Sequence, residues 1–214
     1  MQLIRTAAVA TLPLALMLAG CGITTSGSAE PASPLVESRV VDTGAQHDIR
    51  QTDDDGQPLP FQTTFPNRWN SGNDGTPYEP CTTASPALLR ALDLDPTSVQ
   101  DAASADFQTA RGCGWRAQSS SRSTIDQFVG NQPRLKIYKE QQTATKNWQP
   151  DISISGRTVA VASDPTSPMC DTFVESANAL VITSAAVYDA GTSLPQICDK
   201  AIAFTRATID QMPE

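Results

Sequence analysis

The sequence predicts an α+β fold in which a mainly antiparallel sheet of about four to six strands carries helices packed on one face. Three observations lead to this prediction. Short apolar or alternating segments separated by turn-forming residues are typical of antiparallel strands. Other segments repeat apolar residues every three or four positions, as helices do. Four cysteines beyond the N-terminal segment can form two disulfides that hold such a domain together.

The first predicted helix begins after Ser85. Ser85-Pro86 has the residue types favoured at an N-cap and in a first helical turn, and the apolar run "ALLRAL" follows directly. Asp95-Pro96 repeats the same kind of start. We therefore expect a second helical turn that continues to Ala103.

Five segments are expected to be strands. "LVITSAAVY" (180–188) is apolar on both faces and should lie centrally in the sheet. Met169–Glu175 should pair with it as a hairpin across "SANA". Alternation in Arg134–Tyr138 predicts a strand with Leu135 and Ile137 pointing inward. The other two are "RGCGWRAQ" (111–118), with Trp115 on the same face as Cys113, and "GRTVAVAS" (156–163).

Two further helices are expected. "EQQTATKNW" (140–148) has the composition of a polar, exposed helix. The C-terminal helix is better defined, because Thr192 or Ser193 can cap it and Pro195 stands near its start. The following residues recur every three or four positions along it: Leu194, Ile197, Cys198, Ala201, Ile202, Thr205 and Ile209.

The N-terminus reads as a bacterial lipoprotein signal, residues 1–20. Arg5 precedes an apolar run from Thr6 to Leu18, which is too short for a membrane-spanning helix. "LAGC" (18–21) resembles a lipobox, whose cysteine carries acyl chains after the signal is cut. Cys21 would then anchor the protein to the outer face of the cell membrane, since two acyl chains give stable anchoring. The alternative is an ordinary secreted protein.

Residues 21–57 are expected to be a lipidated flexible tether and residues 58–214 a single extracytoplasmic domain. "GITTSGSAEPASP" and "QTDDDGQP" are too polar to bury the apolar surface that would offset their ordering entropy. Within the tether, "LVESRVV" (35–41) could form a short strand or dock on a partner. The rest of the chain has enough apolar residues for one modest core.

The overall charge argues against nucleic-acid binding. The chain has 15 basic and 23 acidic side chains and a formal net charge of −8. Nucleic-acid binding depends on neutralising phosphates with basic side chains. We therefore expect the membrane, through lipid on Cys21, and an envelope protein or small ligand as partners, but no nucleic acid.

The cysteines predict two disulfides and no metal site. If Cys21 carries lipid, Cys81, Cys113, Cys170 and Cys198 remain. Three connectivities are possible, and we favour the two sequence-local pairs, 81–113 and 170–198. Each would close a loop of about 30 residues and contribute about 3–4 kcal/mol in the chain-entropy model. The chain has no CxxC pair and a single His, so zinc is not expected.

Together these motifs resemble a family of actinobacterial envelope lipoproteins with a four-cysteine extracytoplasmic domain of unknown function. The resemblance rests on the lipobox, "EPCTTASPALLRALDL", "CGW", "MCDTFV" and "PQICDKAIAFTRATI", and covers roughly residues 58–214. It implies the same disulfide pairing and an extracytoplasmic location. It implies no activity, because the family has none assigned.

The search for catalytic residues favours binding over catalysis. His47, the single His, lies in the expected tether, and no known nucleophile motif is present. Neither a cofactor nor a metal is expected. We therefore predict a non-enzymatic lipoprotein that binds a partner protein or small envelope ligand. The alternatives are a hydrolase that uses Asp or Glu in a surface cleft, and a purely structural envelope component.

The candidate binding residues are aromatic side chains in an otherwise polar segment: Phe61, Phe65, Trp69 and Tyr78. If exposed, they could stack on a sugar or hold a peptide. If buried, they would fix an irregular segment to the sheet. Burial is the favoured interpretation, because long aperiodic segments usually persist only when they are packed or functional.

Overall fold

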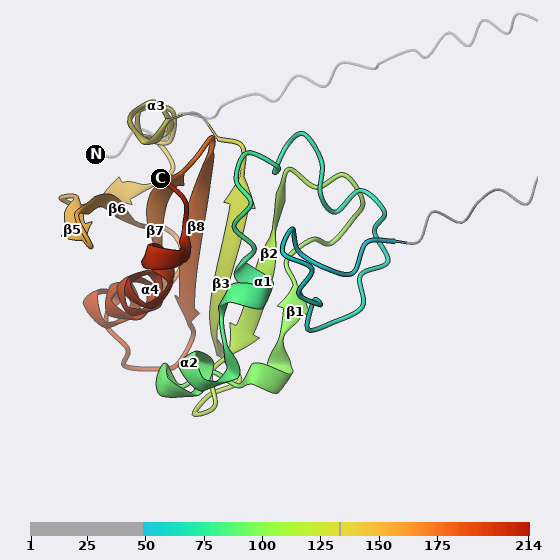
Figure 1. The fold of residues 1–214 in the computed structure, drawn as a ribbon. Helices are drawn as coiled ribbons and strands as arrows, with labels where there is room; N and C mark the ends of the chain where they lie inside the picture. Colours follow the sequence, from blue (N-terminus) through green and yellow to red (C-terminus); the bar gives the residue numbers. More distant parts are fainter. Residues whose placement is uncertain (1–48, 133) are drawn as a thin grey trace, which may run out of the picture. The chain divides into compact units, whose positions relative to one another are not determined.

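The computed structural model describes residues 49–132 and 134–214. They form an eight-stranded antiparallel sheet in the order β1-β2-β3-β8-β7-β6-β4, with β5 paired to β6 (Figure 1). The predicted α+β class is confirmed, with more strands than expected. The strands are β1 (Gln100–Asp101), β2 (Ala110–Arg116), β3 (Ser123–Gly130), β4 (Asn147–Trp148), β5 (Ile152–Ile154), β6 (Arg157–Ser163), β7 (Met169–Ser176) and β8 (Ala179–Val187).

Helices α2 (Pro86–Ala91) and α4 (Leu194–Thr208) begin where the sequence places capping residues. The Ser85 hydroxyl accepts the N–H of Leu88 at the start of α2, and Ser193 forms a capping box with Gln196 at the start of α4. The segment after Asp95 forms one 3₁₀ turn and then β1, rather than a helix to Ala103. The helices are α1 (Pro80–Thr83), α2 (Pro86–Ala91), α3 (Leu135–Gln141) and α4 (Leu194–Thr208), with 3₁₀ turns η1 (Pro96–Ser98) and η2 (Ile209–Gln211).

Helix α4 covers one face of the sheet. Its Phe204 ring lies 5.5 Å from the ring of Trp115 on β2, and Thr205 is hydrogen-bonded to Thr172 on β7 and to Thr183 on β8. These strand residues alternate with those that face the other way. The main core therefore lies between α4 and the centre of the sheet.

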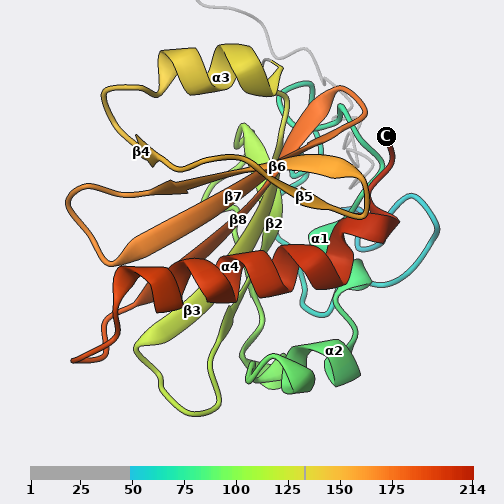
Figure 2. The same ribbon diagram turned by 90° about the vertical axis from the view of Figure 1, so that its left-hand side faces the viewer.

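Helix α3 packs on the opposite face, so the prediction that helices cover one face is wrong. Figure 2 shows the strands passing between α3 and α4. Leu135 and Tyr138 of α3 pack in a separate cluster with Phe173 of β7, which neighbours the α4-facing Thr172. The two faces of β7 thus serve two different layers.

The predicted strand at 134–138 and the predicted helix at 140–148 are both corrected by α3. Leu135 is 7% exposed but Ile137 is 46% exposed, because only Leu135 and Tyr138, three residues apart, share the packed side of a helix. The helix ends at Gln141, and Asn147–Trp148 pairs with β6 as β4.

Strand β3 was not predicted, because a polar residue interrupts its apolar alternation. Gln127 is fully buried between Ile125 and Val129. Its amide nitrogen donates to Thr183 Oγ1 at 2.9 Å and to Thr208 Oγ1 at 3.2 Å. Burial costs little for an amide whose hydrogen bonds are made.

Both disulfides have the expected pairing. Cys81–Cys113 links α1 to β2, and Cys170–Cys198 links β7 to α4. Cys21, the expected lipidation site, lies outside the described residues, as do the signal peptide and His47.

The folded region begins before residue 58. Gln51 and Thr63 exchange two hydrogen bonds of 2.9 and 3.0 Å, and the Thr82 hydroxyl donates to Asp53 at 2.6 Å. Residues 49–57, assigned to the tether by composition, are therefore held by contacts that composition does not reveal. The rest of the expected tether, 21–48, lies outside the described residues.

Candidate functional site

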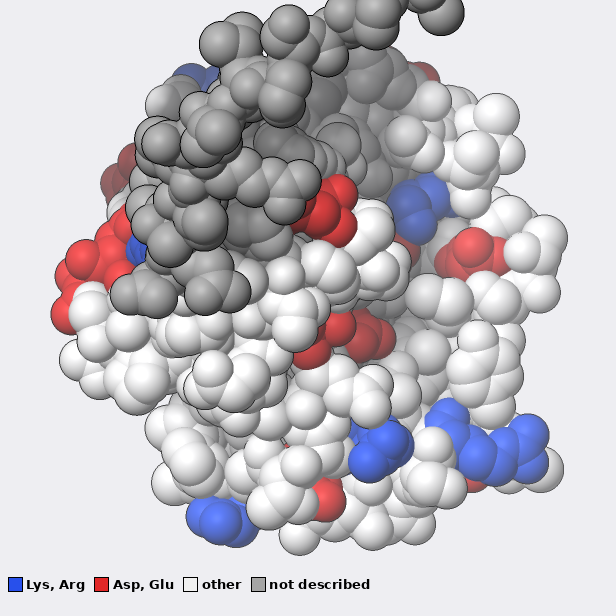
Figure 3. All heavy atoms as spheres, turned by 90° about the vertical axis from the view of Figure 1, so that its right-hand side faces the viewer, with Lys and Arg blue, Asp and Glu red and all other residues white. Residues whose placement is uncertain are grey.

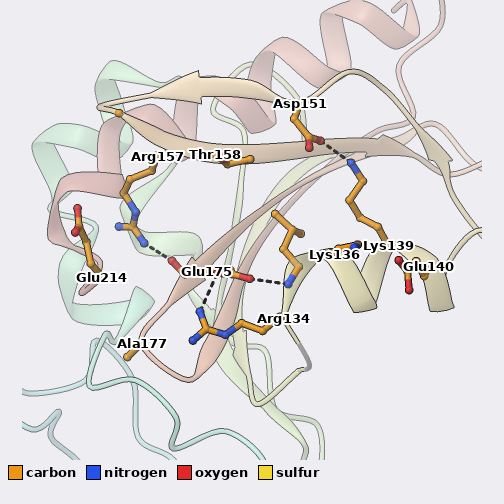
Figure 4. A pocket seen from close by; sticks show the side chains of 12 residues that line it. Arg134, Lys136, Lys139, Glu140, Asp151, Arg157, Thr158, Glu175, Ala177 and Glu214 are labelled. Atoms are coloured by element: carbon orange, nitrogen blue, oxygen red, sulfur yellow. Dashed lines mark hydrogen bonds and ion pairs between the residues drawn. The ribbon is translucent and has the colours of Figure 1, made fainter.

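A cleft of about 710 Å³ lies among the described residues, and we call it the α3 cleft. It lies between α3, the β5–β6 turn, the β7–β8 turn and the C-terminal residues (Figure 4). Its volume falls within the range of small-molecule and peptide sites. Eight charged side chains line it, four of each sign: Arg134, Lys136, Lys139, Arg157, Glu140, Asp151, Glu175 and Glu214.

Glu175, at the end of β7, fixes the start of α3. One carboxylate oxygen accepts the backbone N–H of Leu135 at 2.8 Å, and the other accepts Arg134 Nη1 at 3.1 Å. A carboxylate at a helix start is favourable because the first N–H groups have no partner within the helix. This contact holds one wall of the α3 cleft against the sheet.

A second ion pair joins α3 to the segment before β5. Lys139 Nζ lies 2.6 Å from Asp151 Oδ1 (Figure 4). The same nitrogen lies 5.3 Å from the ring centroid of Trp148. Both charged groups are partly exposed, so the pair contributes at most about 1 kcal/mol to stability. Its main effect is to hold α3 close to the residue that precedes β5.

Arg157 builds the remaining wall. Its guanidinium donates to the carbonyls of Ile209 at 3.1 Å and Met212 at 2.7 Å, and also to the carbonyl of Glu175. These bonds satisfy C-terminal carbonyls that the last helical turns leave free. They hold the C-terminal residues, including Glu214, beside the α3 cleft.

The α3 cleft thus offers fixed charges of both signs in a concave surface. Such a surface suits a ligand that carries both an anionic and a cationic group. Within residues 49–132 and 134–214, no cluster of three or more His, Cys, Asp or Glu side chains is arranged to hold a metal ion.

The predicted aromatic residues lie elsewhere, in a segment that we call the aromatic segment (residues 59–80). A buried ion-pair network holds this segment. Arg68, which is fully buried, pairs with Glu79 at 2.9 Å and with Asp101 at 3.1 Å, and Glu79 also pairs with Arg111 at 2.9 Å. The segment is therefore clamped to β1 and β2.

The four aromatic side chains do not form one open surface. Tyr78 is buried, and its hydroxyl donates to Gln127 at 2.7 Å, so it is not available to a ligand. The guanidinium of Arg68 lies 4.6 Å from the Trp69 ring and 5.6 Å from the Phe61 ring. Trp69, Phe61 and Phe65 are half-buried, and none of the four lines the α3 cleft.

None of the charged residues of the α3 cleft was a predicted site residue. They come from five separate parts of the chain, and charged side chains in a sequence usually indicate solvated surface. The one available signal was the charge density of "RLKIYKE" (134–140), which was interpreted as part of a strand and a polar helix.

Comparison with known proteins identifies a family but no function. A family model described as a protein of unknown function, DUF3558, matches residues 16–211. No curated protein and no solved structure matches the chain.

Proposed function

The chain belongs to the DUF3558 family, whose function is unknown, and we propose that it is a membrane-anchored lipoprotein of the cell envelope that binds a ligand without chemically changing it. The observation that carries the binding function is the α3 cleft, with four cationic and four acidic side chains around about 710 Å³. The ligand that matches it best is a short peptide segment with both positive and negative groups. Such a segment could belong to a partner protein or could be a small peptide of the envelope.

The contacts of two of the four carboxylates in the α3 cleft favour binding over the alternative of hydrolysis. Glu175 is engaged by Arg134 and by the start of α3, and Asp151 by Lys139. A general acid or base must be free to reach the proton that it transfers. These two groups serve instead to position the walls of the α3 cleft.

The location outside the cytoplasm is supported by the disulfides and the N-terminal sequence. Disulfides persist in oxidising compartments, and the "LAGC" motif resembles a lipobox, with Cys21 at the position that would be lipidated. In the residues that the structure describes, no helix has the length and apolarity to cross a membrane. An anchor at Cys21 would place the domain on the outer face.

We do not propose nucleic acid as a partner. The formal net charge is −8, and acidic and basic side chains are interspersed on the described part of the face that Figure 3 shows. A nucleic-acid site requires clustered basic side chains.

A peptide titration tests this proposal. Lipid-free chain starting at residue 22 would be titrated with Ala-Glu-Lys-Ala and with terminally blocked tetra-alanine, with amide NMR shifts as the readout. We expect only the charged peptide to shift Lys136 and Gly156, which line the α3 cleft. Lys136→Glu should weaken binding about tenfold, which corresponds to about 1.4 kcal/mol. Arg90→Glu, on exposed α2, is the matched control.

Two results would contradict the proposal. Equal shifts with both peptides would show that charge does not direct binding. Cleavage of the charged peptide, lost in Glu175→Gln, would favour the hydrolase alternative.

A further inference from the structure

A second cavity, separate from the α3 cleft, lies against the Cys81–Cys113 disulfide. Its volume is about 310 Å³. It is lined by residues of α1, α2, η1 and β2 and of the first folded segment, which we define as residues 49–60. The lining includes Cys81, Leu89 and Trp115. We call it the disulfide pocket.

The lining of the disulfide pocket is uncharged. Of its lining residues only Gln57, Thr82 and Ser85 have polar side chains, and the others are apolar. The α3 cleft, in contrast, is mostly charged. Moving a charged group into an apolar site is costly unless it is paired, so the disulfide pocket selects an uncharged, apolar occupant.

The walls of the disulfide pocket are constrained by prolines, a hydrogen bond and a disulfide. Four prolines from three segments line it: Pro58, Pro60, Pro86 and Pro96. The hydrogen bond from Thr82 to Asp53 fastens the first folded segment to α1, and the disulfide fastens α1 to β2. A pocket that is already formed gains from burying apolar surface without an added ordering cost.

The size of the disulfide pocket limits how much of an occupant it can cover. A volume of 310 Å³ corresponds to roughly ten water-sized volumes, and so to about ten non-hydrogen atoms. That is the size of a medium-length hydrocarbon chain.

The position of the disulfide pocket indicates where such a chain would come from. Gln57 and Pro58 line it, and they follow closely after Ile49, where the described chain begins. If Cys21 is lipidated, as proposed above, residues 22–48 would join the domain covalently to acyl chains in the membrane.

We propose that the disulfide pocket binds a lipid acyl chain of about ten carbons. The preference for hydrocarbon follows from the pocket itself. The choice of a membrane lipid as its source rests on the proposed anchor.

Uncharged alkanols provide a direct test on the lipid-free chain from residue 22. Calorimetric titration with 1-hexanol to 1-tetradecanol should show affinity rising about fourfold per methylene, then levelling near ten carbons. Absence of binding, or affinity that rises through tetradecanol without levelling, would overturn the proposal. Because this chain carries no lipid and alkanols carry no charge, failure here would leave the proposed anchor and peptide binding standing.

Variants locate the binding. Val99→Phe should fill the disulfide pocket and weaken decanol binding at least tenfold, while Ile137→Phe on α3 should leave it unchanged. Pro60→Trp, at an exposed lining position, provides a second filling variant if Val99→Phe does not fold. Decanol affinity unchanged in a folded filling variant would place the binding elsewhere and overturn the proposal.

Competition distinguishes a lipid from a protein side chain. Monomeric dioctanoylphosphatidylcholine should displace decanol, and a terminally blocked Leu-Leu dipeptide should not. The opposite result would overturn a lipid as the occupant.

Discussion

Two arginine side chains, Arg68 and Arg111, are almost completely enclosed by the fold, and Glu79 lies between them. Glu79 accepts a hydrogen bond from each at 2.9 Å, and Asp101 completes the balance of charge beside Arg68. Arg111 also donates to the carbonyls of Thr76 and Tyr78 at 2.7 and 2.8 Å. These bonds replace the β-sheet pairing that the aromatic segment lacks.

Removing the central charge should destabilise the protein strongly. Glu79→Gln would leave the buried guanidinium of Arg111 without a carboxylate partner and that of Arg68 with Asp101 alone, and we expect a loss of about 3–5 kcal/mol in unfolding free energy. Asp54→Asn, which removes the exposed pair with Arg50, should cost less than about 1 kcal/mol. Urea denaturation measures both. Similar costs for the two variants would show that the buried network is not a main support.

Asp126 on β3 provides a pH-dependent prediction. It lies over Gly114 of β2, where a Cβ would come within 2.0 Å of its carboxylate. Burial raises the pKa of Asp126 to about 6, from an ordinary value of 3.8. The folded protein therefore retains this proton at a pH where the unfolded chain has lost it. The contribution of Asp126 to stability falls as the pH rises from about 4 to 6.

Asp126→Asn isolates this effect, because an amide does not ionise. We expect the variant to be more stable than the wild type by about 2–3 kcal/mol at pH 8, and by less than about 1 kcal/mol at pH 4. Thermal and urea unfolding at the two pH values measure the difference. A pH-independent difference would mean that Asp126 does not titrate in this range.

Helices and strands whose own sequence contains the capping, turn and apolar pattern of the element were predicted. Those whose structure depends on contacts with distant residues were not. The cap and apolar stripe predicted α4, and the β7–β8 hairpin followed from "SANA" between two apolar runs. Helix α3 was missed because its five-residue start also fits a strand, and contact with Phe173 decides between them. The α3 cleft could not be predicted for the same reason, since it exists only where separate segments meet.

Two substitutions distinguish the observed helix from the predicted strand. Ile137→Lys should change the unfolding free energy by less than about 0.5 kcal/mol, because Ile137 is exposed and Lys is a good helix former. Leu135→Ala should cost about 2–4 kcal/mol, because that side chain is buried. Comparable, large costs would support the strand, in which both residues point inward.

At the scale of the whole molecule, the proposed anchor requires one atom, the sulfur of Cys21. Cys21→Ala should move the protein from the membrane fraction to the soluble fraction, since no acyl chain could then be attached. Thr24→Ala, three residues further along, is the matched control and should remain in the membrane fraction. Immunoblots of fractionated cells measure this, and equal retention of both variants would reject the lipid anchor.

The two disulfides also determine how the domain would respond to force. They leave the seam between β3 and β8, at the centre of the sheet, without a covalent link. A domain anchored at its N-terminus and loaded at the α3 cleft would transmit tension through this seam. After the seam opened, each disulfide would prevent the residues between its two cysteines from being stretched out. The paired cysteines are 32 and 28 positions apart. The oxidised domain would therefore be a shorter tether under load than the reduced one.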